Sequence, residues 1–208
     1  YGLKVSGAEA DFGAIVKRSR DVADGMSKGI QFLLKKNKVD VITGVGKIKQ
    51  GKKVAVTGAD GKSTDYEAKN IIIATGARSR ELPNLKQDGK KVIGYREALV
   101  LPNQPKSMVV VGSGAIGVEF AYFYNALGTK VTIVEYLQNI VPVEDEDISH
   151  QLSRSFKKSG IEIMTEASVE SVDTSGSLCK VKVKTKKEEV QAISDRLFSY
   201  RHCRSLHR

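Results

Sequence analysis

The chain has 208 residues, of which 40% are hydrophobic and 6% aromatic, which suits one large folded domain or two small ones. No stretch approaches the roughly 18 continuous apolar residues of a membrane-spanning helix, so we expect no membrane partner. Two cysteines are too few for a disulfide framework, and we therefore expect a reducing, cytoplasmic environment.

The formal net charge is +10, with lysines spread along the whole chain beside apolar residues. A basic protein of this kind can bind a polyanion such as nucleic acid. However, the sequence has no stripe of aromatic and basic residues and no nucleic-acid recognition motif. We therefore predict solubilising charge and no nucleic-acid partner, and keep polyanion binding as an alternative.

The first third of the chain predicts one helix followed by strands. Apolar residues recur every three or four positions across residues 9–36, which predicts a long amphipathic helix. Residues 39–42 predict a short buried strand. Residues 53–57 and 63–68 alternate in polarity around Asp60-Gly61, a turn sequence typical of a β-hairpin.

An unbroken apolar run, I-I-I-A-T-G at residues 71–76, predicts a strand covered on both faces, as in a parallel sheet. Residues 77–106 are polar and hold three of the four prolines, so a domain boundary falls among them. We divide the chain into a first domain at 1–82, a linker at 83–106, a second domain at 107–190 and a tail at 191–208.

The second domain alternates strands and helices. The order β-α-β-α-β, followed by a meander, is typical of a doubly wound α/β fold. The predicted strands cover residues 108–111, 130–135, 161–164, 169–173 and 178–185, and the predicted helices cover 114–127 and about 145–159.

A glycine-rich motif carries the chemistry of this domain. Residues 112–117, G-S-G-A-I-G, follow an apolar strand and open a helix, and Glu135 ends the next strand 23 residues after Gly112. This context predicts a Rossmann-type dinucleotide-binding site. Gly112 permits the tight turn, Gly114 lets a pyrophosphate approach the backbone, and Gly117 lets helix and strand pack closely.

Glu135 also predicts which dinucleotide binds. Its carboxylate accepts hydrogen bonds from a ribose 2′-hydroxyl and repels a 2′-phosphate, and residues 136–140 contain no Lys or Arg to bind that phosphate. The sequence therefore favours NAD over NADP. The alternative is a packed βαβ unit that binds no ligand.

Several segments resemble the pyridine nucleotide–disulfide oxidoreductase family, and within it the lipoamide dehydrogenases. The segments with this resemblance are A-T-G-A-R at 74–78, L-P at 82–83, G-S-G-A-I-G-V-E at 112–119, V-T-I-V-E at 131–135, G-V-G-K-I at 44–48 and G-I-Q-F-L-L-K-K-N-K-V at 29–39. The resemblance implies an α/β chain with a Rossmann-type NAD-binding domain and the back part of an FAD-binding domain. The alternative is that the chain comes from another disulfide reductase of this family.

The resemblance also implies cofactor contacts, which we carry over onto matching positions only. Glu119 matches the family glutamate near nicotinamide and flavin, although such a residue taken alone is more often a solvated helix position. The flavin contacts are Gly46, Thr75, Gly76 and Ala77, and the NAD contacts are Gly112, Ser113, Gly114, Ala115, Ile116, Gly117, Val118, Glu119, Glu135 and Val169.

The resemblance implies a reaction in which dihydrolipoamide reduces a protein disulfide, whose electrons pass through FAD to NAD. It implies lipoyl-bearing subunits of 2-oxoacid dehydrogenase complexes as partners, and a homodimer. A free-standing NAD-binding module without catalysis is the alternative from another class. NADH binding separates a folded module from an unfolded one.

The expected catalytic groups are not in this sequence. It has no second G-x-G-x-x-G, no C-x-x-x-x-C pair and no C-terminal His–Glu pair, so we predict an internal fragment without catalytic residues or turnover. Cys179 alternates with valines and predicts a buried structural thiol, and His150 predicts a solvated helix residue. His202, Cys203 and His207 lack a second ligand pair, so we predict no metal site.

Residues 191–208 change composition abruptly, with S-D-R-L-F-S-Y-R where the resemblance implies an apolar strand ending in glycine. Our hypothesis is that a frame shift produced this tail from about residue 191 onward. Sequencing the source DNA tests it, because a one-base correction should restore the strand. The alternative is a genuine basic, disordered tail.

Overall fold

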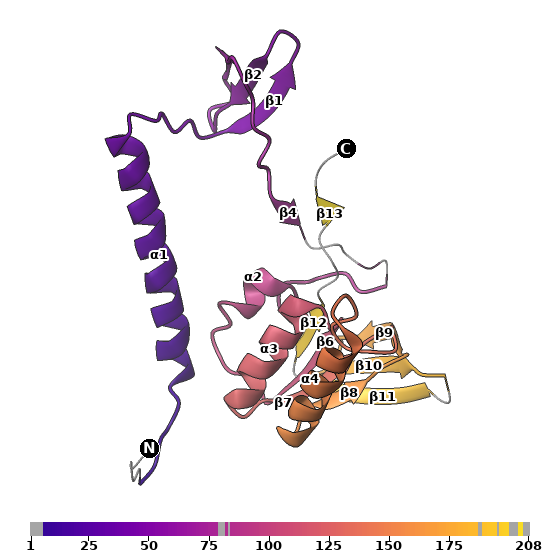
Figure 1. The fold of residues 1–208 in the computed structure, drawn as a ribbon. Coiled ribbons are helices and arrows are strands. Elements are labelled where there is room, and N and C mark those ends of the chain that lie inside the picture. The colour runs from indigo at the N-terminus through magenta and orange to yellow at the C-terminus, as the bar shows by residue number, and fades with distance from the viewer. Residues whose placement is uncertain are drawn as a thin grey trace. The chain divides into compact units, whose positions relative to one another are not determined.

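The computed structural model describes residues 6–78, 82, 84–186, 189–194, 196–199 and 204–205 (Figure 1). The chain divides into two compact units. Unit 1 comprises Tyr1–Lys17 and Ala77–Arg208, and unit 2 comprises Arg18–Gly76.

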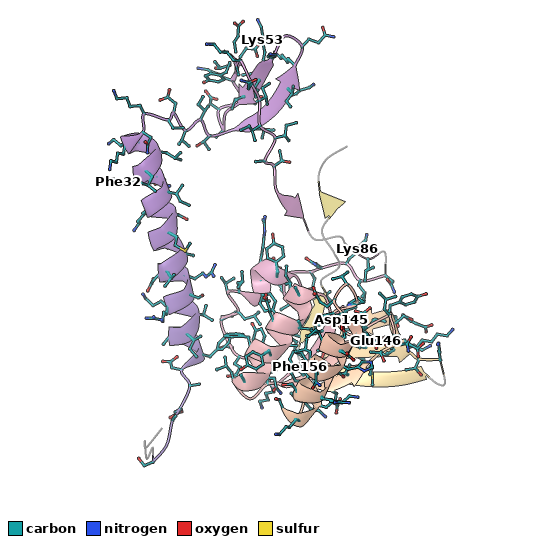
Figure 2. All side chains as sticks on the ribbon, in the orientation of Figure 1. Phe32, Lys53, Lys86, Asp145, Glu146 and Phe156 are labelled. Atoms are coloured by element: carbon teal, nitrogen blue, oxygen red, sulfur yellow. The ribbon has the colours of Figure 1, made fainter. Side chains whose placement is uncertain are left out.

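Unit 1 contains a five-stranded parallel sheet in the order β5-β12-β6-β7-β8. Helices α3 and α4 connect β6 to β7 and β7 to β8, as the sequence predicted. Asp145 and Glu146 mark the start of α4, and the buried Phe156 lies near its end (Figure 2). The bounds are β5 Val92–Ile93, β6 Ser107–Val111, α3 Ala115–Ala126, β7 Lys130–Val134, α4 Glu146–Lys158, β8 Glu162–Met164 and β12 Arg196–Ser199.

The parallel sheet is covered on both faces, which explains its uninterrupted apolar strands. On one face, Val110 and neighbouring strand residues pack against Tyr124 of α3 and Phe156 of α4, forming the helix-side core. On the other face, Val109 packs with Val181 of a three-stranded antiparallel sheet, forming the sheet-side core. This second sheet has the order β11-β10-β9, with bounds β9 Ser168–Asp173, β10 Cys179–Lys184 and β11 Glu189–Ser194.

The linker predicted at residues 83–106 is instead part of unit 1. It contains β5 and a short helix, α2 at Tyr95–Ala98. Ile93, Ala98 and Leu101 are all buried in the helix-side core. A few apolar residues spaced through this polar, proline-containing segment are enough to bury it, although its average composition is that of a linker.

A buried hydrogen bond from Tyr124 connects α3 to the segment at residues 83–106, and a conservative substitution tests its contribution to stability. Its hydroxyl donates a 2.6 Å hydrogen bond to the Ala98 carbonyl, and burial raises the pKa of Tyr124 to about 12. We expect Tyr124→Phe to lower the free energy of unfolding by about 1–2 kcal/mol, because a buried carbonyl loses its partner. Urea unfolding measures the loss. Tyr122→Phe, on the same helix but 60% exposed, should change stability little. Equal losses in the two variants would contradict a stabilising role for the Tyr124–Ala98 hydrogen bond.

Strand pairing in unit 1 continues past the domain boundary predicted at residue 190. β11 pairs with β10, and β12 lies between β5 and β6 in the parallel sheet. Leu197 and Phe198 are fully buried in the sheet-side and helix-side cores respectively. Two adjacent apolar residues, one facing each core, suffice for a central strand, although arginine and serine flank them. The hypothesis that a frame shift produced residues from about 191 onward remains a prediction.

Unit 2 confirms the predicted helix and hairpin. α1 covers Phe12–Lys36, and its residues up to Lys17 belong to unit 1, where Phe12 packs against Tyr124. β2 at Lys53–Thr57 and β3 at Ser63–Glu67 form the hairpin, with β1 at Val45–Lys49 on the other edge of β2. Within the described part of the chain, no helix is long and apolar enough to cross a membrane.

The two other strands predicted in unit 2 do not form. Residues 39–42 and 71–76 have no regular structure, and Val41 and Ile72 are 66% and 91% exposed. A strand requires a neighbour for its backbone hydrogen bonds, and no other described segment of unit 2 pairs with these runs. Apolar composition alone was therefore not sufficient to place them in a sheet.

Candidate nucleotide-binding site

The chain turns sharply between β6 and α3 at Gly112. Its φ of +96° lies in the left-handed region, which glycine adopts without steric cost. Its N–H donates a 2.9 Å hydrogen bond to the Val134 carbonyl at the end of β7. The turn therefore holds the loop at the carboxyl ends of two neighbouring parallel strands, where doubly wound folds bind their ligands.

The other two glycines of the motif differ in how closely other atoms surround them: Gly117 is tightly packed and Gly114 faces open space. A Cβ on Gly117 would lie 2.1 Å from the Gly112 carbonyl oxygen, so only glycine allows α3 to approach the loop this closely. A Cβ on Gly114 would meet no atom within 4 Å. The space beside Gly114 therefore remains open at the point where α3 begins.

The start of α3 is suited to a phosphate. Gly114 precedes the helix with extended backbone and offers no side-chain cap. The first N–H groups of a helix lack intrahelical partners, and the helix dipole adds positive potential at this end. Open space, uncapped N–H groups and a glycine backbone together fit a dinucleotide pyrophosphate.

Glu135 lies directly beside this loop. The residue is only 8% exposed, and its Oε2 accepts hydrogen bonds from the Ser113 N–H at 2.8 Å and the Ser113 hydroxyl at 2.7 Å. Its Oε1 accepts a 2.9 Å bond from the Leu137 N–H. A carboxylate has about four acceptor positions, so capacity for a ribose hydroxyl remains on Oε1.

Sequence reasoning missed the bonds that fix this arrangement. It assigned Ser113 to the nucleotide, whereas the fully buried Ser113 binds Glu135 through both its N–H and its hydroxyl. The Ser113 carbonyl also accepts a 3.0 Å bond from the Val141 N–H. Val141 has a φ of +43°, unfavourable for a β-branched residue, and no sequence signal marked it.

The remaining predicted NAD residues are spread over different surroundings. Ala115 and Glu119 are exposed on α3, Ile116 is half-buried, and Val118 is buried in the helix-side core. Val169 is buried in the sheet-side core on β9, and its carbonyl accepts a 2.9 Å bond from Asn84 Nδ2. The structure thus places Ser113 of the glycine-rich loop against Glu135, and the nucleotide contacts of all these residues remain predictions.

A family model for pyridine nucleotide-disulphide oxidoreductases matches residues 3–199. The chain belongs to this family. Membership implies FAD and NAD as the cofactors, and the predicted α/β fold class is confirmed by the parallel sheet and by the structural relatives.

Relatives of this oxidoreductase chain include dihydrolipoyl dehydrogenase from Zymomonas mobilis, which is 45% identical over 172 residues. The protein of the same name from Chlorobaculum tepidum is 48% identical over 177 residues. These matches cover 83% and 85% of this chain but 37% and 38% of the relatives. The chain therefore spans less than two-fifths of the length of these relatives.

Solved structures resemble this oxidoreductase chain as well. LpdA from Mycobacterium tuberculosis is 28% identical with a TM-score of 0.83, over 93% of this chain and 43% of that one. The HOCl-induced flavoprotein disulfide reductase RclA from Escherichia coli is 25% identical with a TM-score of 0.80, over 95% of this chain and 44% of that one.

The predicted flavin residues are divided between the two units of the chain. Gly46 is exposed in β1, where a Cβ would make only an ordinary 3.6 Å contact with Val54. Thr75 and Gly76 are exposed in an irregular segment, and a Cβ on Gly76 would meet nothing. Ala77 begins β4, Ala77–Arg78, which belongs to unit 1 and pairs with β13, Arg204–Ser205. The flavin contacts of these four residues remain predictions.

The cysteine and histidine residues singled out in the sequence lie in different surroundings. Cys179 is a fully buried cysteine in the sheet-side core, as predicted, and its Sγ lies 4.0 Å from the Lys91 carbonyl oxygen. His150 is about half exposed on α4, 3.8 Å from Glu146. No group of three potential metal ligands gathers within the described ranges. His202, Cys203 and His207 lie outside those ranges.

Proposed function

We propose that this chain supplies the NAD-binding site of a dihydrolipoyl dehydrogenase. The main support is the buried Glu135 carboxylate, which is hydrogen-bonded to the glycine-rich loop beside the open space at the start of α3. The names of the curated relatives support the choice of enzyme. In the whole protein, protein-bound dihydrolipoamide is oxidised, with electrons passing through FAD to NAD.

The chain's own residues bind and orient the nucleotide. N–H groups at the start of α3 hold the pyrophosphate, and Gly114 allows its close approach. Glu135 accepts a hydrogen bond from the adenosine ribose, while Ser113 and Leu137 keep the carboxylate in place. NAD supplies the hydride acceptor of the reaction. The protein contributes orientation and electrostatics.

The partners and setting belong to the same proposal. Lipoyl-bearing subunits of 2-oxoacid dehydrogenase complexes deliver the substrate, and the whole enzyme works as a homodimer in the cytoplasm. The only cysteines in this sequence are Cys179 and Cys203, so it contains no closely spaced redox pair. We therefore expect no lipoamide reduction by this chain alone.

A second candidate is another flavoprotein disulfide reductase of the same family. The resemblance to the RclA structure supports it, at a TM-score of 0.80 and 25% identity. Both candidates use the same nucleotide site. A non-catalytic NAD-binding module is the third, and lipoamide turnover by the whole protein would eliminate it.

Nucleotide titration tests the site itself. We expect NADH to bind the purified chain saturably, with NADPH at least roughly tenfold weaker, a difference of about 1.4 kcal/mol. The 2′-phosphate of NADPH both repels the Glu135 carboxylate and cannot donate the ribose hydrogen bond. NADH fluorescence measures both affinities. Equal affinities would contradict the assignment of Glu135 to the ribose, and absence of NADH binding would contradict the proposed function.

A further inference from the structure

A second concave site lies on unit 1, away from the glycine-rich loop. A cavity of about 290 Å³ opens between α4, the loop that follows β7, and the end of β8. None of residues 112–118 lines it. Its walls are mostly polar, which distinguishes it from a gap in the hydrophobic core.

Positive charge gathers on the α4 side of this cavity. His150, Arg154 and Lys157 line it, at spacings of four and three residues that place them on one face of the helix. No aspartate or glutamate is among its lining residues. Among the described residues, neither the Arg154 guanidinium nor the Lys157 ammonium makes a hydrogen bond or ion pair. Two cations thus face the cavity without a carboxylate to neutralise them.

Neutral hydrogen-bonding groups complete the polar lining. Gln138 and Asn139 come from the loop after β7, Ser153 from α4 and Thr165 from the end of β8. Within the described part of the chain, none of these four side chains has a hydrogen-bond partner. Amides and hydroxyls from three elements therefore converge with the cations on one space.

We propose that this cavity binds a phosphate-bearing small molecule. Arg154 can hold two phosphate oxygens with its planar guanidinium, and Lys157 adds a point charge beside it. A single phosphate leaves much of a space of about 290 Å³ unfilled, so the ligand carries an organic part as well. Ile140 and Ile163 supply the apolar contact for that part.

The test must separate this cavity from the start of α3, because both attract anions. Two-dimensional NMR of the ¹⁵N-labelled chain locates each binding event by its amide shifts. We expect inorganic phosphate and glycerol 3-phosphate to shift amides at 138–140, 150–157 and 163–165, with glycerol 3-phosphate binding more tightly. Shifts confined to 112–118 would overturn the proposal, as would the absence of saturable shifts.

A matched pair of substitutions tests the cations. Arg154→Gln should weaken glycerol 3-phosphate binding at the cavity by about tenfold or more, because a charge-assisted pair is lost. Lys158→Gln removes the same charge from an exposed α4 residue outside the cavity lining, and should change affinity less than about twofold. Equal losses in the two variants would mean general surface charge and overturn the proposal. Tighter binding of citrate than of either phosphate would overturn the choice of phosphate. Circular dichroism confirms that both variants remain folded.

Discussion

Gly117→Ala is expected to destabilise unit 1 by roughly 3 kcal/mol or more and to abolish NADH binding. The added methyl carbon would lie 2.1 Å from the Gly112 carbonyl oxygen, far inside van der Waals contact. That oxygen belongs to backbone, so it cannot rotate away as a flexible side chain would. Either α3 moves outward or the Gly112 turn opens, and each change disrupts the phosphate-binding loop. Urea unfolding and NADH fluorescence measure the two effects.

Gly114→Ala provides the matched comparison, because it adds the same methyl group where there is no clash. A Cβ at Gly114 meets no atom within 4 Å. Its backbone is extended, so alanine adopts it without strain, and stability should stay within about 0.5 kcal/mol. NADH affinity should still fall roughly 10–100-fold, about 1.4–2.8 kcal/mol, because the methyl fills the pyrophosphate space.

The two variants together distinguish packing from binding. Loss of stability in Gly117→Ala with loss of affinity alone in Gly114→Ala supports separate roles for the two glycines. If Gly114→Ala bound NADH as tightly as the parent chain, the pyrophosphate would not lie at the start of α3.

The NAD-binding half of unit 1 could be predicted because its signals are local. Glycine spacing fixed the turn at Gly112 and the start of α3, and alternating apolar strands and helices fixed β6 through β10 in order. Val109 and Val110 illustrate why: neighbouring residues of a parallel strand face two different cores, so the strand is apolar throughout.

The errors fall where structure depends on distant pairing. Ile72 looked as apolar as Val110, but it remains exposed because no described segment of unit 2 pairs with it. Phe198 shows the opposite case. It lies in a mostly polar segment, yet it is fully buried, because its strand β12 pairs with both β5 and β6. The composition of a short segment does not show which distant strand it can pair with. This limited the predictions for residues 71–76 and for the segment that contains Phe198.

The site shows the same division. Gly112, Gly114, Gly117 and Glu135 were identified by spacing, because backbone conformation and strand ends follow from it. The bond between Ser113 and Val141 was not, because it depends on how the loop after β7 folds back. The phosphate-binding cavity was missed for a related reason: its groups come from three elements with no shared motif.

The last prediction concerns the carboxylate that links loop and nucleotide. Glu135→Ala should lower the free energy of unfolding by about 2–3 kcal/mol, because the buried Ser113 N–H and hydroxyl and the Leu137 N–H lose their acceptor. NADH affinity should fall by roughly 100-fold, about 2.8 kcal/mol, as the ribose contact is lost and the loop loosens. Glu162→Gln, an exposed carboxylate on β8, should change either quantity by less than about 1 kcal/mol.

Glu135→Gln separates charge from shape at the same position. The amide retains one acceptor oxygen for Ser113, but its NH₂ group faces the Leu137 N–H, so stability should fall less than in Glu135→Ala. Removing the negative charge should also narrow the preference for NADH over NADPH, because the 2′-phosphate no longer meets a carboxylate. Fluorescence titration with both nucleotides measures that ratio. An unchanged ratio would mean that Glu135 holds the loop through Ser113 but does not face the ribose, which would limit its role to positioning.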